Sequence, residues 1–106
     1  MAGGEWLDVA AEGAIGEGDF EIVETDDNVV AVFNVAGVYL AIEDVCTHDG
    51  AELAGGPLDG DQIICPRHGA RFCLRTGRAL TPPAYEDVPT YPVKVSNGRI
   101  LVQIPD

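Results

Sequence analysis

The stretches CTHDG (residues 46–50) and CPRHGARF (residues 65–72) each place a cysteine shortly before a histidine and a glycine. Cys46 and His48 are two positions apart, and Cys65 and His68 are three apart. These are the only two histidines in a chain of 106 residues that has three cysteines. Two thiols and two imidazoles on two separate loops are a possible ligand set for one metal centre.

Two kinds of centre accept this ligand set. A structural zinc site binds two cysteines and two histidines tetrahedrally, whereas a mixed-ligand iron–sulfur centre has two histidines in place of two cysteines on one iron. Zinc sites of this composition usually carry the cysteines on one turn and the histidines on another, but here each loop carries one of each. The spacing therefore favours two irons, with the cysteines on the inner iron and the histidines on the outer one.

Composition and charge exclude several classes of protein. The longest apolar-rich run covers 29–42 and is too short to cross a bilayer. The start, MAGGEWLDVA, has acidic residues where a signal peptide has a basic flank, and the cysteine count is odd, so we expect a reduced, cytoplasmic protein with no membrane partner. The formal net charge is −12, which argues against a nucleic acid partner.

The charge is unevenly distributed along the chain. Residues 1–64 contain fifteen acidic residues and no lysine or arginine, whereas residues 65–106 contain six basic and three acidic residues. Four arginines lie in or just after the second Cys/His pair. An acidic protein surface of this kind favours solubility and attraction to basic partners.

Strand patterns dominate the chain, and no window of a dozen residues has helical periodicity, although residues 43–56 could hold a single turn. The expected turns include Ala36-Gly37 and Asn97-Gly98. The expected strand segments are 20–24, 29–35, 38–43, 61–65, 70–77 and 91–104. We predict an all-β fold in one domain, residues 1–106. Its core sheets come from about 1–45 and 82–106, and a cluster-binding subdomain from about 46–81 is inserted between them.

The two quoted stretches resemble the cluster-binding boxes of Rieske proteins, C-x-H and C-x-x-H around a [2Fe–2S] centre. The resemblance extends through LDGDQIICPRHG (residues 58–69) and RTGRAL (residues 75–80). It implies three stacked antiparallel sheets with one [2Fe–2S] cluster at a tip. By position, Cys46 and Cys65 would bind the buried iron, and His48 and His68 the outer iron near the surface.

The chain's size resembles that of the soluble Rieske-type ferredoxins that supply electrons to bacterial ring-hydroxylating oxygenases in aromatic hydrocarbon catabolism. This resemblance implies a one-electron carrier, not an enzyme. It would accept electrons from a flavin-containing ferredoxin reductase and pass them to a terminal oxygenase, docking by its histidine tip. Two alternatives remain: the small Rieske-like subunit of an assimilatory nitrite reductase, and a structural zinc module for protein contacts.

Four positions depart from the high-potential Rieske proteins of respiratory complexes. Ala51 and Arg67 stand where those proteins have a second cysteine pair, and Ala70 and Phe72 stand where they have a serine and a tyrosine that donate hydrogen bonds. Fewer donors leave the reduced cluster less stabilised. We therefore expect a reduction potential towards the low end of the Rieske range, roughly −150 to +300 mV. A redox titration with its midpoint in the upper half of that range would contradict this expectation.

Several further residues have weaker signals. Strand alternation across residues 70–75 places Cys73 beside Arg71 and Arg75 as a small packed residue. Arg67 is a candidate partner contact beside His68, and Trp6 is expected in the core. Pro82-Pro83 resembles the family's proline loop, which covers the cluster.

Overall fold

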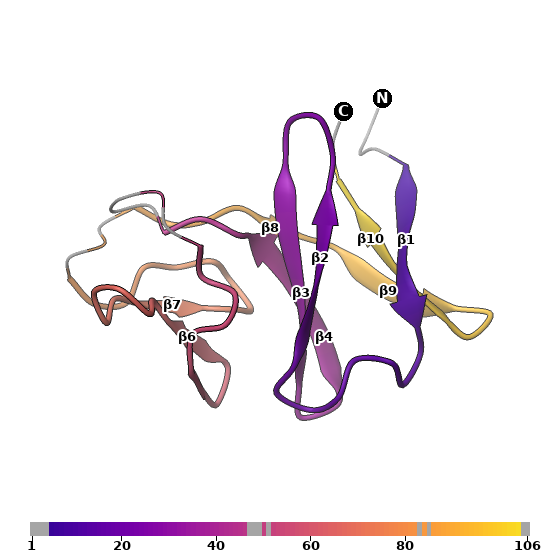
Figure 1. The fold of residues 1–106 in the computed structure, drawn as a ribbon, viewed down its shortest axis with the longest axis horizontal. Coiled ribbons are helices and arrows are strands. Elements are labelled where there is room, and N and C mark those ends of the chain that lie inside the picture. The colour runs from indigo at the N-terminus through magenta and orange to yellow at the C-terminus, as the bar shows by residue number, and fades with distance from the viewer. Residues whose placement is uncertain (1–4, 47–49, 51, 83, 85, 105–106) are drawn as a thin grey trace.

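The computed structural model describes residues 5–46, 50, 52–82, 84 and 86–104. Every regular element in this part of the chain is a β-strand (Figure 1). The strands form three antiparallel sheets with the orders β1-β10-β9, β2-β3-β4-β8 and β5-β6-β7. Their bounds are Trp6–Ala11 (β1), Phe20–Glu24 (β2), Val29–Val35 (β3), Val38–Glu43 (β4), Leu58–Asp59 (β5), Gln62–Ile64 (β6), Arg71–Cys73 (β7), Thr90–Tyr91 (β8), Val93–Ser96 (β9) and Arg99–Gln103 (β10). The predicted all-β class is confirmed.

The sheet β2-β3-β4-β8 is the middle layer, because its central strand is apolar on both faces. On β3, Phe33 and Val35 pack in one hydrophobic core, whereas Val30 and Val32 pack in another. Successive side chains of a strand point to opposite faces, so a continuously apolar strand is stable only when both faces are covered. The run VVAVFNV therefore explains why the protein has three layers.

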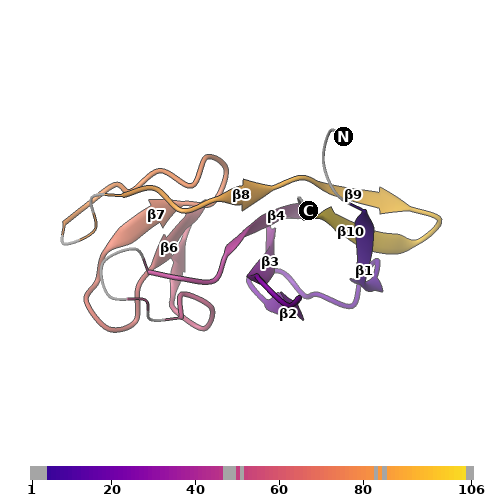
Figure 2. The ribbon, with the colours of Figure 1, turned by 90° about the horizontal axis from the view of Figure 1, so that it is seen from above.

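The two outer layers cover the two faces of the middle sheet. Ile100 and Val102 of β10 complete the core that holds Val30 and Val32. On the opposite face, Ile63 of β6 and Phe72 of β7 are fully buried in the core that holds Phe33. Figure 2 shows the succession of layers, with β6 and β7 at one end, β1, β9 and β10 at the other, and β2, β3 and β4 between them.

The two predicted hairpin turns are present. Ala36 and Gly37 join β3 to β4 with φ angles of 52° and 90°, and Asn97 and Gly98 join β9 to β10 with φ angles of 52° and 76°. Two consecutive positive φ values define the turn type that matches the twist of paired strands. These turns fix the register in which Val35 pairs with Val38 and Arg99 with Ser96.

The strand expected over residues 70–77 is shorter in the structure. β7 ends at Cys73, and the chain then turns, because the Gly77 N–H donates a hydrogen bond to the Cys73 carbonyl at 2.7 Å. Two strands, β1 and β5, were not predicted. Trp6 lies half-buried on β1 with the Lys94 ammonium 4.2 Å from the centre of its ring, so it is only partly a core residue.

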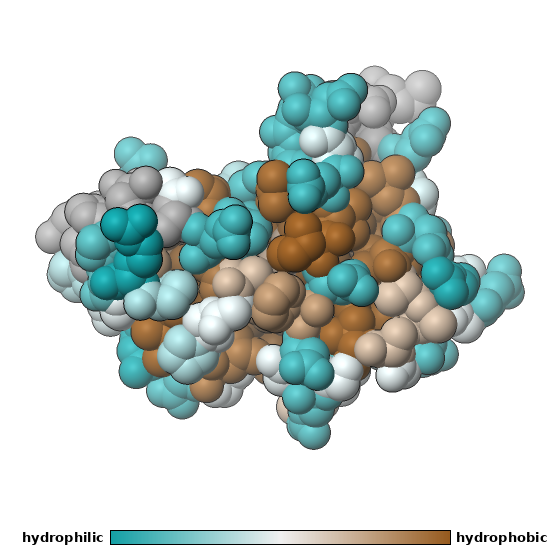
Figure 3. Space-filling view, in the orientation of Figure 1, coloured by the Kyte–Doolittle hydropathy of each residue, from teal (hydrophilic) through white to brown (hydrophobic). Residues whose placement is uncertain are grey.

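On one face of the molecule, exposed hydrophobic side chains lie over the middle layer (Figure 3). Figure 3 shows hydrophobic side chains gathered over the centre of this face, where β2 and β3 run, with polar ones around them. Phe20 on the edge strand β2 is 38% exposed, although its ring packs against Phe33 with 5.8 Å between centroids. No helix in the described residues is long and apolar enough to cross a membrane.

A polar network links β8 to β3 and β4 within the middle sheet. The Tyr91 hydroxyl donates a hydrogen bond to Glu43 Oε1 at 2.7 Å, and Asn28 Nδ2 donates to the same oxygen at 3.1 Å. The second Glu43 oxygen accepts from the Val29 N–H at 3.0 Å. Burial, together with the Glu43 carboxylate, raises the pKa of Tyr91 to about 12.

Replacing Tyr91 with phenylalanine is expected to reduce the loss of stability at alkaline pH. The unfolded chain releases the tyrosine proton near pH ~10, whereas the folded protein keeps it up to the raised pKa of about 12. The folded state binds more protons in this window, so Tyr91's contribution is complete below the unfolded pKa and is lost as the pH rises through the window. Denaturant unfolding at about pH 8 and pH 11, on either side of the unfolded pKa, should show a larger loss for the wild type than for Tyr91→Phe. Equal losses would contradict this assignment.

Candidate metal centre

The second Cys/His pair lies in a closed turn after β6. The Cys65 N–H donates to the Ala70 carbonyl at 2.7 Å, and the Gly69 N–H donates to the Cys65 carbonyl at 2.9 Å. Gly69 has a φ of 74°, a left-handed conformation that glycine adopts without steric cost. The turn buries Cys65 to 1% exposure and leaves His68 exposed at its tip.

The first pair begins in a turn of the same kind after β4. The Gly50 N–H donates to the Cys46 carbonyl at 2.7 Å, and Gly50 has a φ of 78°. The cysteine therefore opens both turns, and a left-handed glycine four residues later closes them. Cys46 is fully buried. His48 and Ala51 lie outside the described residues.

The structure brings the two candidate cysteines into one core. Cys46 and Cys65 both belong to the hydrophobic cluster that includes Leu53 and Phe72, and neither is in a disulfide. Ala70 and Phe72, the two departures from the high-potential pattern, are fully buried in the same cluster. Within the described residues, which do not include His48, no group of three or more histidine, cysteine and acidic side chains gathers as a metal site.

This donor set suits an iron–sulfur cluster held at a surface. Two buried thiols in a hydrophobic core and an imidazole at an exposed turn match the donor set of a centre with cysteines on one iron and histidines on the other. An inner iron bound by Cys46 and Cys65 would be shielded from water, whereas an outer iron beside His68 would be close to a docking partner. The residues present therefore fit the group.

A third turn of the same geometry follows β7. The Gly77 N–H donates to the Cys73 carbonyl, and the Cys73 N–H donates to the Arg78 carbonyl at 2.9 Å. The strand alternation that placed Cys73 on a common face with Arg75 stops at Cys73. A hydrogen bond from the Thr76 side chain, supported by backbone N–H groups of Thr76 and Arg75, lowers the pKa of the half-buried Cys73 thiol.

We expect Cys73 to be alkylated by iodoacetamide faster near neutral pH than an ordinary cysteine. Its lowered pKa means a larger thiolate fraction, and the thiolate is the reactive form. Replacing Thr76 with alanine should raise the pKa of Cys73 and slow the reaction, because the largest stabilising contact is removed. Rates at a series of pH values, read from the Cys73 peptide by mass spectrometry, test this. A midpoint at or above the ordinary value of about 8.5 would contradict it.

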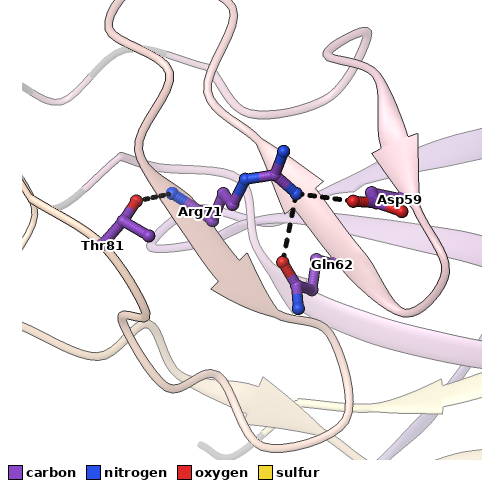
Figure 4. A network of polar contacts seen from close by, with 4 residues as sticks. All are labelled: Asp59, Gln62, Arg71 and Thr81. Carbon is purple, nitrogen blue, oxygen red and sulfur yellow. Dashed lines mark hydrogen bonds and ion pairs between the residues drawn. The ribbon is translucent and has the colours of Figure 1, made fainter.

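Arginine side chains brace the sheet that carries the second turn. Arg71 on β7 reaches across to Asp59 at 2.8 Å and Gln62 at 3.2 Å, and its backbone N–H donates to the Thr81 hydroxyl at 3.0 Å (Figure 4). Arg75 pairs with Asp61 at 3.1 Å. These ion pairs are largely solvent-exposed and each contributes at most about 1 kcal/mol. Arg71 and Arg75 thus have structural contacts, and Arg67 lies exposed beside His68.

Comparison with known proteins places the chain in a family. Residues 5–92 match the Rieske [2Fe–2S] domain. The ferredoxin component of the naphthalene 1,2-dioxygenase/salicylate 5-hydroxylase systems of a Ralstonia species is 38% identical over 99 residues, which are 93% of this chain and 95% of that protein. The solved complex of reduced oxygenase and oxidised ferredoxin in carbazole 1,9a-dioxygenase contains a chain with 34% identity and a TM-score of 0.89, covering 95% of both chains. A putative NADH-dependent nitrite reductase small subunit from Mycobacterium tuberculosis is 28% identical with a TM-score of 0.83, covering 96% of both chains.

The protein belongs to the Rieske [2Fe–2S] domain family. Its match to a ferredoxin component extends over nearly the whole of both chains, which makes it an electron carrier rather than an enzyme. It carries one Rieske-type [2Fe–2S] cluster. The resemblance seen in the two Cys/His stretches is thereby confirmed.

Proposed function

We propose that Cys46, His48, Cys65 and His68 bind this cluster, and that the protein passes single electrons from a flavin-containing ferredoxin reductase to a terminal ring-hydroxylating oxygenase in the cytoplasm. The main support for the proposal is the difference in exposure between the two cysteines and His68. Both cysteines are buried in one core, and His68 is exposed in the turn that follows β6.

In this proposal, the residues of the chain shield the cluster from water and hold its ligands in place. When bound, the cluster stores and releases one electron without making or breaking bonds in the protein. Leu53 and Phe72 pack in the core around the two cysteines and exclude water from that side. The closed turns at Cys65 and Cys46 hold the ligands in place, so little rearrangement accompanies electron transfer.

We further propose that residues 46–81 form the cluster-binding unit and that residues 1–45 and 82–106 form the core sheets. The charge distribution supports this division. Residues 46–81 contain four acidic and four arginine residues and are formally neutral, so the whole formal charge of −12 belongs to the core sheets. A formally neutral cluster-binding unit responds less to the charge of a partner than the acidic body does, which is compatible with docking by the turn that carries His68.

The nitrite reductase alternative has one specific observation in its favour, the likeness to the putative small subunit. The identity to the ferredoxin component is higher, at 38% against 28%. The zinc alternative loses its support, because the family match is to a [2Fe–2S] domain.

An electron paramagnetic resonance spectrum of the dithionite-reduced protein, with iron and sulfide counted on the same sample, tests the ligand assignment. We expect a rhombic signal whose average g lies clearly below that of all-cysteine clusters. Cys73→Ser should leave the signal unchanged, whereas His68→Cys should move the average g towards the all-cysteine value. A wild-type spectrum of the all-cysteine kind, or zinc in place of iron, would overturn the assignment.

Reduction by a flavin reductase and turnover with a ring-hydroxylating oxygenase test the partners. Rapid one-electron reduction of the protein by the flavin reductase, followed by its oxidation by the oxygenase, would support the oxygenase pathway. A purified nitrite reductase large subunit serves as the comparison. Preference for the nitrite reductase would overturn the oxygenase pathway.

A further inference from the structure

The carboxylate of Asp44 closes the loop that begins at Cys46. Asp44 is 8% exposed, and its Oδ1 accepts hydrogen bonds from the backbone N–H groups of Leu53 and Ala54, both at 2.8 Å. Its own backbone N–H donates to the Val29 carbonyl at 2.8 Å, which anchors it to the middle sheet. A buried carboxylate held by two backbone donors is a strong, charge-assisted contact. The end of the first loop is therefore tied to a rigid strand.

The segment that Asp44 holds contacts the second loop directly. Gly56 donates to the Leu53 carbonyl at 3.0 Å, and a Cβ atom on Gly56 would lie 2.1 Å from the Ile64 carbonyl oxygen and 3.1 Å from Pro66 Cδ. Ile64 and Pro66 are the two neighbours of Cys65. The backbone of the first loop is thus packed against both sides of the second cysteine.

We propose that Asp44 is a positioning residue that fixes the separation of the two cysteine loops. The proposal rests on the proposed function of Cys46 and Cys65 as cluster ligands. Asp44 stands two residues before Cys46, and its hydrogen bonds to Leu53 and Ala54 lead through Gly56 to Cys65, so one side chain connects both ligands. A rigid cluster requires its two sulfur ligands at a constant separation, and groups that orient the ligands are decisive for binding.

The charge of Asp44 gives it a second effect. A carboxylate close to the ligands disfavours an added electron, because the reduced site is more negative than the oxidised one. Asparagine has nearly the same shape and keeps the carbonyl oxygen that accepts both N–H groups, but it carries no charge. The two effects can therefore be separated by substitution.

Asn34 provides a matched control. It is 9% exposed, donates to the Ile15 carbonyl at 2.8 Å and accepts from the Gly37 N–H at 2.8 Å. It thus makes one buried and one partly buried hydrogen bond with backbone groups, as Asp44 does. However, it lies at the other end of the β3–β4 hairpin, where it pairs with Tyr39. Removing either side chain costs a comparable number of buried hydrogen bonds.

The experiment compares the holoproteins of the wild type, Asp44→Ala, Asp44→Asn and Asn34→Ala. Cluster loss is followed by visible absorbance in the presence of an iron chelator, the reduction potential by titration, and unfolding by denaturant. We expect Asp44→Ala to lose its cluster at least about tenfold faster than Asn34→Ala at a similar free energy of unfolding, in line with the effect of other ligand-orienting groups. Asp44→Asn should lose its cluster at nearly the wild-type rate and have a higher midpoint potential. Amide exchange at Leu53 and Ala54 should be faster in Asp44→Ala alone.

Equal rates of cluster loss in Asp44→Ala and Asn34→Ala would overturn the positioning role. If Asp44→Ala does not fold, the Asp44→Asn variant provides the test. An unchanged midpoint potential in Asp44→Asn would overturn the effect of the charge. Rapid cluster loss in Asp44→Asn, which retains the hydrogen-bond acceptor, would overturn the hydrogen-bond argument. The wild-type spectrum separates the two proposals. A wild type without a mixed-ligand signal means that the ligand assignment has failed, whereas a normal wild type with indistinguishable alanine variants means that only the role of Asp44 has failed.

Discussion

The variant Gly56→Ala is expected to lose its cluster and a large part of its folding stability. The added Cβ would lie 2.1 Å from the Ile64 carbonyl oxygen, and neither atom belongs to a flexible side chain that can move away. Relief requires the first loop to move away from the second, which separates the two cysteines. Overpacking of this kind costs about 1–3 kcal/mol and occasionally more. Denaturant unfolding and the iron content of the purified protein measure the two effects.

Gly16→Ala is the control for this substitution. Like Gly56, Gly16 does not have a left-handed φ, but its added Cβ would meet only the Asp19 carboxylate oxygen at 3.0 Å, at the end of an exposed side chain that can rotate. We expect a change of at most about 0.5 kcal/mol and a full complement of iron. If Gly56→Ala retains its iron as Gly16→Ala does, the close contact at Gly56 does not fix the separation of the two cysteine loops.

Gly77→Ala is expected to be the most destabilising substitution among the left-handed glycines of the described residues. Gly77 has a φ of 77°, and an added Cβ would lie 2.0 Å from the Val88 carbonyl oxygen and 3.0 Å from Thr90 Cγ2. The Val88 N–H also donates to the Gly77 carbonyl at 2.8 Å, so the two segments cannot separate without losing that bond. The variant combines left-handed strain of about 1 kcal/mol with an overpacking cost of up to about 3 kcal/mol.

Gly60→Ala isolates the first of these costs. Gly60 has a φ of 61°, and an added Cβ meets no atom within 4 Å. Its loss of stability should therefore be limited to about 1 kcal/mol. Urea unfolding tests this comparison. If the midpoint for Gly77→Ala is no lower than that for Gly60→Ala, the segment around Val88 can move away from the added Cβ without a measurable loss of stability.

Sequence patterns predicted most of the middle sheet, and they placed the cysteines of both Cys/His pairs in loops that follow strands, as the structure has them. The hairpin through Ala36-Gly37 was predictable because its strands are short-range partners and its turn residues are specific. β1 was missed because its partner is β10, so that Trp6 pairs with Gln103, and because its pairing is irregular between Asp8 and Ala10. A strand that is stabilised by a distant partner gives only a weak local signal.

The residues that support the ligands were harder to find from the sequence. Asp44 and Gly56 act through backbone groups that are distant in the chain, and no residue pattern reports such contacts. The length of β7, by contrast, could have been predicted from a sequence pattern. The pattern C-x-x-x-G occurs at 46–50, 65–69 and 73–77, and all three copies form the same hydrogen-bonded turn. Recognising the third copy would have ended the strand at Cys73.

The segment between β4 and β8 leaves and rejoins the middle sheet at two neighbouring strands. Its length and shape can therefore vary without changing the rest of the fold. β4 and β8 are paired neighbours, with Ile42 opposite Thr90, and the Glu43 N–H donates to the Pro89 carbonyl at 2.9 Å. Everything between Glu43 and Pro89 is therefore one closed loop on an intact sandwich. Doubling the length of such a loop costs only about 0.6 kcal/mol in closure entropy. A longer or differently shaped metal-binding segment can thus be inserted at this seam, provided that it again covers Phe33 and Ile42.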